Sequence, residues 1–182
     1  MPVVLFLVLL VVYAVAEWLA HRPVSAPAGP APAVASARIG PADIYPDEER
    51  TPGAANPDIT PDNIQDTICN PHWSTRRVRP PAEYTNRLKA QQIDEYGLAD
   101  RSAHDYEEDH LIPLEIGGDP RDPKNLWPEP YDTSIPEGGA HEKDKVENYL
   151  HDEVCAGRIP LREAQHEIAT DWYRVYTEKN LR

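Results

Sequence analysis

Three segments of the chain carry hydrophobic residues at the three- and four-residue spacing of a helix. They span residues 85–96, 141–155 and 161–179. Gly97 and Gly157 follow the first two segments, and glycine commonly ends a helix because it adopts left-handed backbone angles freely. The pattern therefore predicts three helices, and we expect the last two to pack as a pair.

Two shorter stretches between the first and second of these helices have the character of strands. Residues 108–114 form a mostly apolar run that ends at glycines, and residues 125–127 follow a polar loop that contains two prolines. Residues 60–64 carry helix-start residue types. The order helix, strand, loop, strand, helix, helix indicates an α+β fold with a short two-stranded hairpin and no room for a large sheet.

The N-terminus has a different pattern, because residues 3–16 contain no charge. This run is short for a bilayer span, which needs about 20 apolar residues. Ala14-Val15-Ala16 has the small-x-small form of a signal cleavage site. We expect residues 1–22 to be a cleaved signal peptide or an uncleaved anchor that meets the membrane through residues 3–20. Both interpretations predict export, to a secreted, periplasmic or membrane-tethered location.

Proline and alanine dominate the next stretch, which we expect to be a disordered linker over residues 23–58. The folded domain is then expected at 59–182. The length of 182 residues agrees with one such domain plus appendages.

Charge is unevenly distributed along this domain. The whole chain has 18 basic and 31 acidic residues and a formal net charge of −13, which excludes a polycation that coats nucleic acid by bulk charge. Residues 71–90 are nevertheless net basic, whereas 101–140 are strongly acidic. The basic segment is the natural place for a nucleic-acid backbone to bind, although a solvated basic turn is the alternative. Its basic residues are Arg76, Arg77, Arg79, Arg87 and Lys89.

The candidate chemistry lies in the string EDHLIPLEIGG, followed by KNLWPEP and AHEKDK. This order of motifs resembles the HNH endonucleases, whose shared core is a ββα-metal finger made of a hairpin and a helix. The resemblance covers 108–145 and implies phosphodiester hydrolysis with a bound divalent cation. It also implies that further helices flank the ββα core.

The resemblance assigns roles residue by residue. Asp109 and His141 would hold the metal, and His110 would be the general base that activates water. Asn125 would brace the hairpin and orient His110, or become a ligand itself, because prolines and glycines before His141 leave its register open. Two lysines could meet phosphate oxygens, and these are Lys143 and Lys145.

Elementary chemistry agrees with this division of roles. A neutral imidazole is a suitable base near pH 7, and a cation neutralises the charge that develops on the phosphate. One carboxylate and one imidazole admit Mg²⁺, Mn²⁺, Ni²⁺ or Zn²⁺, and no small-molecule cofactor is expected. Glu107 and Glu108 are interpreted as solvated charges.

The chain has two cysteines, Cys69 and Cys155. In an oxidising compartment they could form a disulfide that ties the basic segment to the helix begun by His141, and two buried free thiols are the alternative.

These observations predict an exported, metal-dependent endonuclease of low sequence specificity, with DNA favoured over RNA as its substrate. One alternative is a non-catalytic exported module that binds nucleic acid or the envelope and keeps a metal-stabilised finger. Another is a purely structural domain in which the same residues only pack and turn.

Overall fold

A computed structural model describes residues 42–182 of the chain. The expectations for residues 1–22 and for 23–41 lie outside this part. Its main elements, in chain order, are α2 (Ala82–Glu95), β1 (Tyr106–His110), β2 (Leu126–Pro130), α3 (Ala140–Cys155) and α4 (Leu161–Glu178). Short 3₁₀ turns lie at η1 (Ala42–Ile44), η2 (Thr75–Arg77), η3 (Leu114–Ile116) and η4 (Pro123–Asn125).

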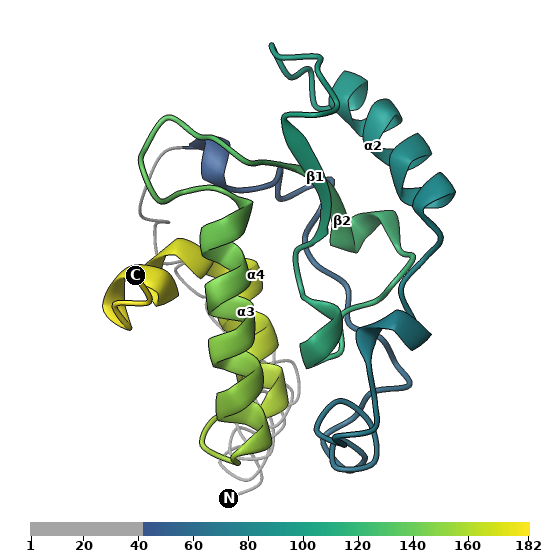
Figure 1. Cartoon of the computed structure of the whole chain (residues 1–182), viewed down its shortest axis with the longest axis vertical. Coiled ribbons are helices and arrows are strands. Elements are labelled where there is room, and N and C mark those ends of the chain that lie inside the picture. The colour runs from purple at the N-terminus through teal and green to yellow at the C-terminus, as the bar shows by residue number, and fades with distance from the viewer. Residues whose placement is uncertain (1–41) are drawn as a thin grey trace, which may run out of the picture. The chain divides into compact units, whose positions relative to one another are not determined.

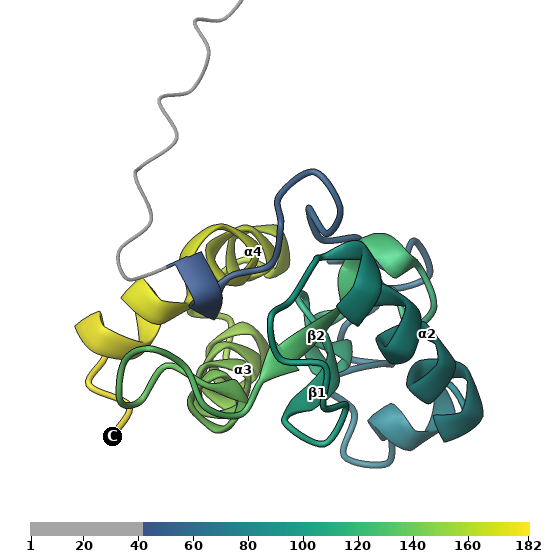
Figure 2. The same ribbon diagram turned by 90° about the horizontal axis from the view of Figure 1, so that it is seen from above.

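The two strands form an antiparallel hairpin in which Asp109 pairs with Trp127 and His110 with Leu126. Helix α2 lies on one side of the hairpin, and α3 and α4 lie together on the other side (Figures 1 and 2). The predicted α+β class is therefore confirmed, as a two-stranded antiparallel hairpin packed with three helices.

The first strand begins and ends earlier than the hydrophobic run indicated, because β1 covers 106–110 and not 108–114. Beyond His110 the chain leaves the hairpin. Pro113 has no N–H to donate to a strand partner, and the backbone groups of Ile112 are bonded to the side chain of Asn125 instead. The apolar residues after β1 are buried in the loop and in η3, so they belong to the core without extending the strand.

The main core lies between α3 and α4, as the helical periodicity predicted. Val146, Leu150 and Val154 of α3 are fully buried, together with Ile168 and Trp172 of α4. Each such side chain removed from water stabilises the fold by about 1.5–3 kcal/mol.

The folded part starts well before residue 59, which corrects the expectation that the linker reaches residue 58. Ile44 and Tyr45 are buried, and the hydroxyl of Tyr45 donates to Asp171 at 2.5 Å. The indole N–H of Trp172 donates to the Ile44 carbonyl at 2.8 Å. These few buried side chains anchor a segment whose proline-rich composition is typical of a linker.

The backbone of α4 is interrupted at Asp171, where φ is −160° and ψ is 73°. The Asp171 side chain accepts a hydrogen bond from the backbone N–H of Arg174 at 3.0 Å. An aspartate that accepts from an N–H three residues ahead is an N-cap, so the second half of α4 begins as a capped helix of its own.

Residues 60–64 form turns and not the start of a helix. The Asn63 side chain accepts from the Thr60 N–H and donates to the Asp58 carbonyl, both at 2.9 Å. Asparagine often closes such local turns in competition with helix formation. The same residue types that favour a helix start can therefore end up in a compact turn.

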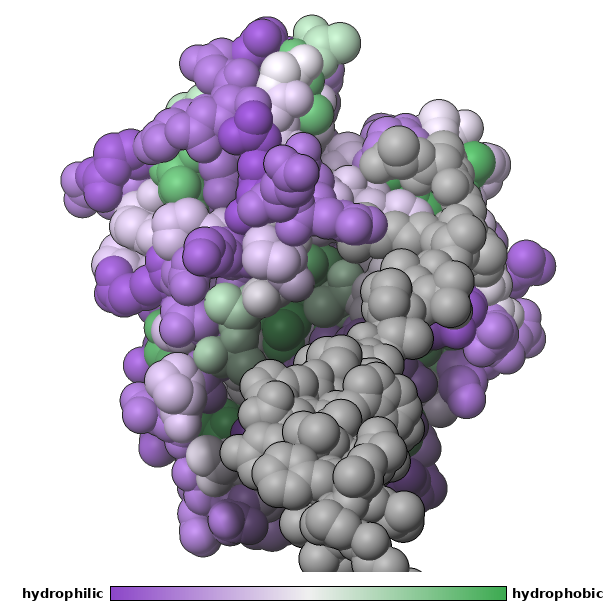
Figure 3. Space-filling model, turned by 180° about the vertical axis from the view of Figure 1, so that it is seen from behind, coloured by the Kyte–Doolittle hydropathy of each residue, from purple (hydrophilic) through white to green (hydrophobic). Residues whose placement is uncertain are grey.

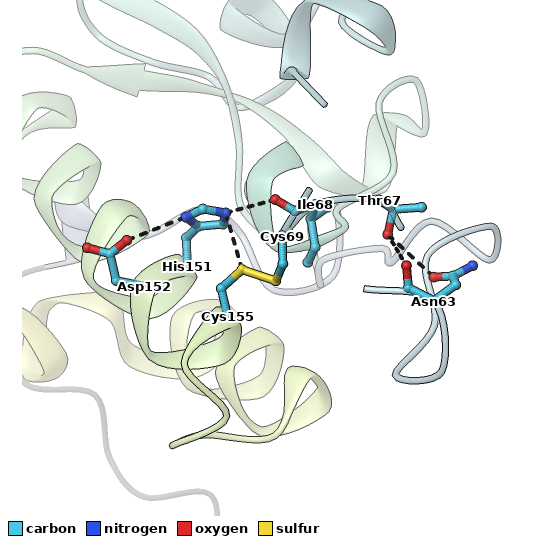
Figure 4. Close-up of a disulfide and its surroundings, with 7 residues drawn as sticks. All are labelled: Asn63, Thr67, Ile68, Cys69, His151, Asp152 and Cys155. Atoms are coloured by element: carbon cyan, nitrogen blue, oxygen red, sulfur yellow. Dashed lines mark hydrogen bonds and ion pairs between the residues drawn. A yellow bond between two sulfur atoms is a disulfide. The ribbon is translucent and has the colours of Figure 1, made fainter. Parts of the chain in front are cut away.

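A disulfide joins Cys69 to Cys155 at the end of α3, as one of the two sequence interpretations predicted. His151, one turn earlier in α3, lies against it (Figure 4). Its Nε2 is 3.0 Å from the Ile68 carbonyl oxygen and 3.5 Å from the Cys155 sulfur. The bond thus fixes the segment that leads into the basic residues against the helix that follows the hairpin.

The face opposite to that in Figure 1 is mostly hydrophilic, with a hydrophobic patch near its centre (Figure 3). Within residues 42–182, no helix combines the length and the apolar character needed to cross a membrane.

Candidate functional site

Adjacent residues at the end of β1 point to opposite faces of the hairpin, as the alternation of a strand predicts. His110 lines a cleft against α2, whereas Asp109 is paired with Lys143 of α3. The hairpin therefore separates the predicted general base from the predicted metal ligand.

Asn125 is fully buried and holds the loop that connects the strands. Its amide oxygen accepts from the N–H groups of Ile112 at 2.9 Å and Ala54 at 3.2 Å. Its amide nitrogen donates to the carbonyls of Ile112 at 2.9 Å and Asp119 at 3.0 Å. This agrees with the bracing role that the sequence predicted for Asn125.

Gly118 shows how closely this loop is packed. A Cβ atom at Gly118 would lie 1.7 Å from the carbonyl oxygen of Ile112, so no other residue fits there. The braced loop also carries Pro120, whose carbonyl contacts His110.

The His110 ring is only 3% exposed, and its Nε2 lies 3.2 Å from the Pro120 carbonyl oxygen. Because a carbonyl can only accept, Nε2 carries the proton. In the neutral ring Nδ1 is then the basic nitrogen, and no partner for it is found among the residues from 42 onward. Burial lowers the pKa of His110 below the ordinary value, although Asp109 opposes the shift. His110 is therefore a neutral base at pH 7.

The cleft beside His110 has a volume of about 400 Å³. Its walls come from the segment before α2, from α2 itself and from β1, so it joins the predicted basic segment to the predicted base. The side chains with polar groups in its lining are Arg79, Thr85, Asn86, Lys89, Glu107, Glu108, His110 and Tyr131.

Glu108 shares this cleft, and the interpretation of Glu108 as a solvated charge is wrong. It is 8% exposed, and neither of its carboxylate oxygens has a hydrogen-bond partner in the described part of the chain. Burial, together with the charge of Asp109, raises its pKa to about 8. The signal was present in the sequence, because residues two apart on a strand share a face and His110 had already been assigned to the site.

Asp109 belongs to a buried ion cluster on the α3 side. The Lys143 ammonium lies 2.5 Å from an Asp109 carboxylate oxygen, contacts Glu147, and is 3.9 Å from Glu129. It also donates to the His110 carbonyl at 3.0 Å. Lys143 thus ties α3 to the end of β1 at the residue that carries the candidate base.

The cluster contains one ammonium group and three carboxyl groups, so a single positive charge cannot balance all three carboxyl groups in their ionised form. Burial would raise the pKa of Asp109, but Lys143 outweighs it and holds that pKa below its ordinary value. Burial raises the pKa of Glu147 to about 8 and that of Glu129 well above the ordinary value. Near pH 7 the cluster is therefore an Asp109–Lys143 ion pair flanked by two largely protonated acids.

His141 lies at the start of α3, with a side chain that is 73% exposed. Its Nδ1 is 4.0 Å from Asp144, and its ring centroid is 5.4 Å from that of Tyr131. Tyr131 and His141 line a second cleft of about 550 Å³, formed by the loop after β2 and the first turn of α3.

The divalent cation implied by the sequence resemblance can be compared with these contacts. In the described part of the chain, no three His, Cys, Asp or Glu side chains are grouped so that they could hold a metal ion. Asp109 is engaged by Lys143, while the contacts of His141 are with Asp144 and Tyr131. Asp109 and His141 do not form a ligand set here, and their metal-binding role stays a prediction.

The predicted phosphate-binding residues fall into different settings. Arg79 is exposed and lines the His110 cleft, whereas the Lys89 ammonium donates to two backbone carbonyls at 2.7 Å. Lys143 is completely buried, so the structure does not support a phosphate contact by it. Lys145 is exposed and lies 3.7 Å from Glu142. The remaining predicted residues are exposed and lie away from the cleft lining: Arg76, Arg77 and Arg87.

No family model, curated protein or solved structure matches this chain.

Proposed function

We propose that this protein is a nuclease that hydrolyses phosphodiester bonds, with His110 as the general base. The observation that carries the proposal is the cleft that brings His110 and Arg79 together. Hydrolysis needs a base for the attacking water and a positive charge beside the phosphate. His110 is held neutral with Nε2 bonded to Pro120, and Arg79, which lines the same cleft, supplies the charge.

The other residues act by positioning the base. Asn125 holds the loop that presents the Pro120 carbonyl, and that contact fixes which nitrogen of His110 is protonated. Lys143 holds the backbone of His110 from the α3 side. In this arrangement a water molecule in the cleft gives its proton to Nδ1 and attacks the phosphorus atom, while Arg79 pairs with a phosphate oxygen. The bond from phosphorus to one sugar oxygen breaks, and that oxygen leaves as a hydroxyl after taking a proton from solvent.

The proposal is tested by cleavage of supercoiled plasmid and of labelled oligonucleotides by the full chain. Parallel reactions contain EDTA, Mg²⁺, Mn²⁺, Ni²⁺ or Zn²⁺, which also tests the predicted cation requirement. His110→Ala is expected to slow cleavage by about 10²–10⁴-fold, the usual contribution of a positioned base. His104→Ala, at an exposed histidine outside the cleft, serves as the matched control.

Equal rates for His110→Ala and wild type would remove His110 from the mechanism. Absence of cleavage by folded wild-type protein under every condition would reject the nuclease proposal and favour a non-catalytic binding module. The pH profile gives a second readout. Because the pKa of His110 is lowered, the rate should stay constant through neutral pH and decline only below the range of an ordinary histidine.

A further inference from the structure

The two clefts of the site adjoin each other, and Tyr131 lines both. Tyr131 directly follows the last residue of β2, so the hairpin fixes the position of its backbone on the N-terminal side. Its backbone N–H donates to the Asp105 carbonyl at 3.0 Å. A Cβ atom at Gly139 would lie 2.0 Å from the Tyr131 carbonyl oxygen, so the glycine lets the start of α3 approach this residue closely. The backbone therefore holds Tyr131 beside His141.

Both rings are accessible to a ligand. Tyr131 is 36% exposed and is the one exposed large hydrophobic side chain within residues 42–182. The His141 ring is inclined by 33° to it, with a side chain that is 73% exposed. Aromatic side chains displayed in this way stack with nucleobases in proteins that bind single strands, and such stacking tolerates every base.

The charged groups around the two clefts differ. The second cleft is lined by the acidic residues Asp132, Glu137 and Glu142 and by no lysine or arginine. The His110 cleft carries the basic Arg79 and Lys89 beside Glu107 and Glu108, and burial raises the pKa of both glutamates. A phosphate is repelled by the acidic set of the second cleft and attracted by Arg79. A nucleobase is uncharged, so it can occupy the acidic cleft while its phosphate lies at Arg79.

We propose that Tyr131 and His141 form a stacking platform for one unpaired nucleobase, next to the phosphate bound in the His110 cleft. This inference rests on the proposed nuclease function and names its substrate class as single-stranded or locally unpaired nucleic acid. The bases of an intact duplex are stacked on one another, so none of them can lie on the platform without being unpaired. The platform contacts the base and not the sugar, so it serves DNA and RNA alike.

The test measures binding, so that it does not depend on turnover. Fluorescence anisotropy of the full chain is recorded with short phosphorothioate oligonucleotides in deoxy and ribo form, as single strands and as duplexes. Tyr131→Ala is expected to weaken single-strand binding by roughly 5- to 100-fold, the usual contribution of one stacked base, and to leave duplex binding unchanged. Tyr131→Trp, which keeps an aromatic face, should bind within about threefold of wild type.

His141→Ala is the second variant, because its exposed side chain can be removed without disturbing the core. It should weaken single-strand binding in the same direction. His166→Ala, at an exposed histidine of α4, is the matched control and should have no effect. Circular dichroism of each variant confirms that the fold is retained.

Single-strand binding that is unaffected by both Tyr131→Ala and His141→Ala would overturn the platform. Equal losses for single strands and duplexes would also overturn it, because stacking of an unpaired base predicts a selective loss. Cleavage that depends on His110 together with an inert Tyr131 would reject the platform alone. Selective single-strand binding without cleavage would reject the nuclease function and keep the platform.

Discussion

The two faces of β1 differ in how completely their polar groups are paired. On the α3 face, Asp109 is neutralised by the buried Lys143, and Glu147 contacts the same ammonium. On the α2 face, His110 has one hydrogen bond to a carbonyl, and neither oxygen of Glu108 has a partner within residues 42–182. Asp109 and His110, which point to these two different faces, are adjacent residues of one five-residue strand.

This difference indicates that the residues on one face mainly stabilise the fold and that those on the other face are available for chemistry. A buried charge that has a partner fixes the structure, and removing one member leaves the other uncompensated. Polar groups that are buried beside a cleft without partners weaken the fold and are free to act on a ligand. We therefore expect mutations on the α3 face to change stability most, and mutations at His110 to change activity most.

Lys143→Met should give the largest loss of stability, because it leaves the buried Asp109 carboxylate without a countercharge. The expected cost is about 3–5 kcal/mol in the free energy of unfolding, measured by urea denaturation near pH 7. Lys145→Met removes an exposed lysine from the same helix and should cost less than about 1 kcal/mol. Similar stabilities for the two variants would contradict the structural role of the cluster.

Asp109→Asn makes a further comparison within this cluster. Its cost should be smaller than that of Lys143→Met, because Glu129 and Glu147 remain beside the ammonium and can lose their protons to balance it. A larger cost for Asp109→Asn would mean that the flanking acids do not act as reserve partners.

Asn125→Ala should have the next largest effect, because four hydrogen bonds of a buried amide are lost. We expect a cost of about 3 kcal/mol, together with faster hydrogen exchange at the Ile112 N–H. Asn148→Ala, on the exposed side of α3, should stay within about 0.5 kcal/mol of wild type. Unchanged exchange at Ile112 would show that the loop does not depend on Asn125.

Glu108→Gln should change stability by an amount that depends on pH. The pKa of Glu108 is about 8 in the folded protein and near 4.5 when unfolded, so the folded state binds the proton more tightly. Glu108 therefore makes stability fall as the pH rises from about 4.5 through 8. Its removal should raise stability at pH 8 relative to pH 5 by roughly 3–4 kcal/mol.

Thermal unfolding of both proteins across this pH range measures the effect. Glu83→Gln, at an exposed position in the first turn of α2, should leave the pH profile unchanged. A Glu108→Gln profile parallel to that of wild type would mean that Glu108 is ionised in the folded protein.

Several features of this site could be predicted from local sequence. Strand alternation placed Asp109 and His110 on opposite faces, and helical periodicity identified the faces of α3 and α4 that pack together. Alternation and periodicity are short-range properties, in which backbone geometry alone decides where a side chain points. The bracing role of Asn125 was implied by the resemblance of its motif and not by backbone geometry.

The features that were missed depend on long-range contacts. Lys143 and Glu147 are one helical turn apart, which sequence shows, but the burial of Lys143 depends on Asp109 and Glu129 from the two strands. The early start of the folded part depends on Ile44 and Tyr45 meeting the kink of α4. Composition reports the average of a segment and cannot reveal one or two anchoring side chains.

The disulfide has a topological consequence. Cys69 and Cys155 are 86 positions apart and enclose a ring of chain that contains α2, the hairpin and α3, whereas α4 lies outside it. A protease that cuts one exposed bond within this ring opens it but releases no fragment, because the two pieces remain linked through sulfur. The nicked protein should migrate at full mass on a non-reducing gel and separate into two pieces only after reduction.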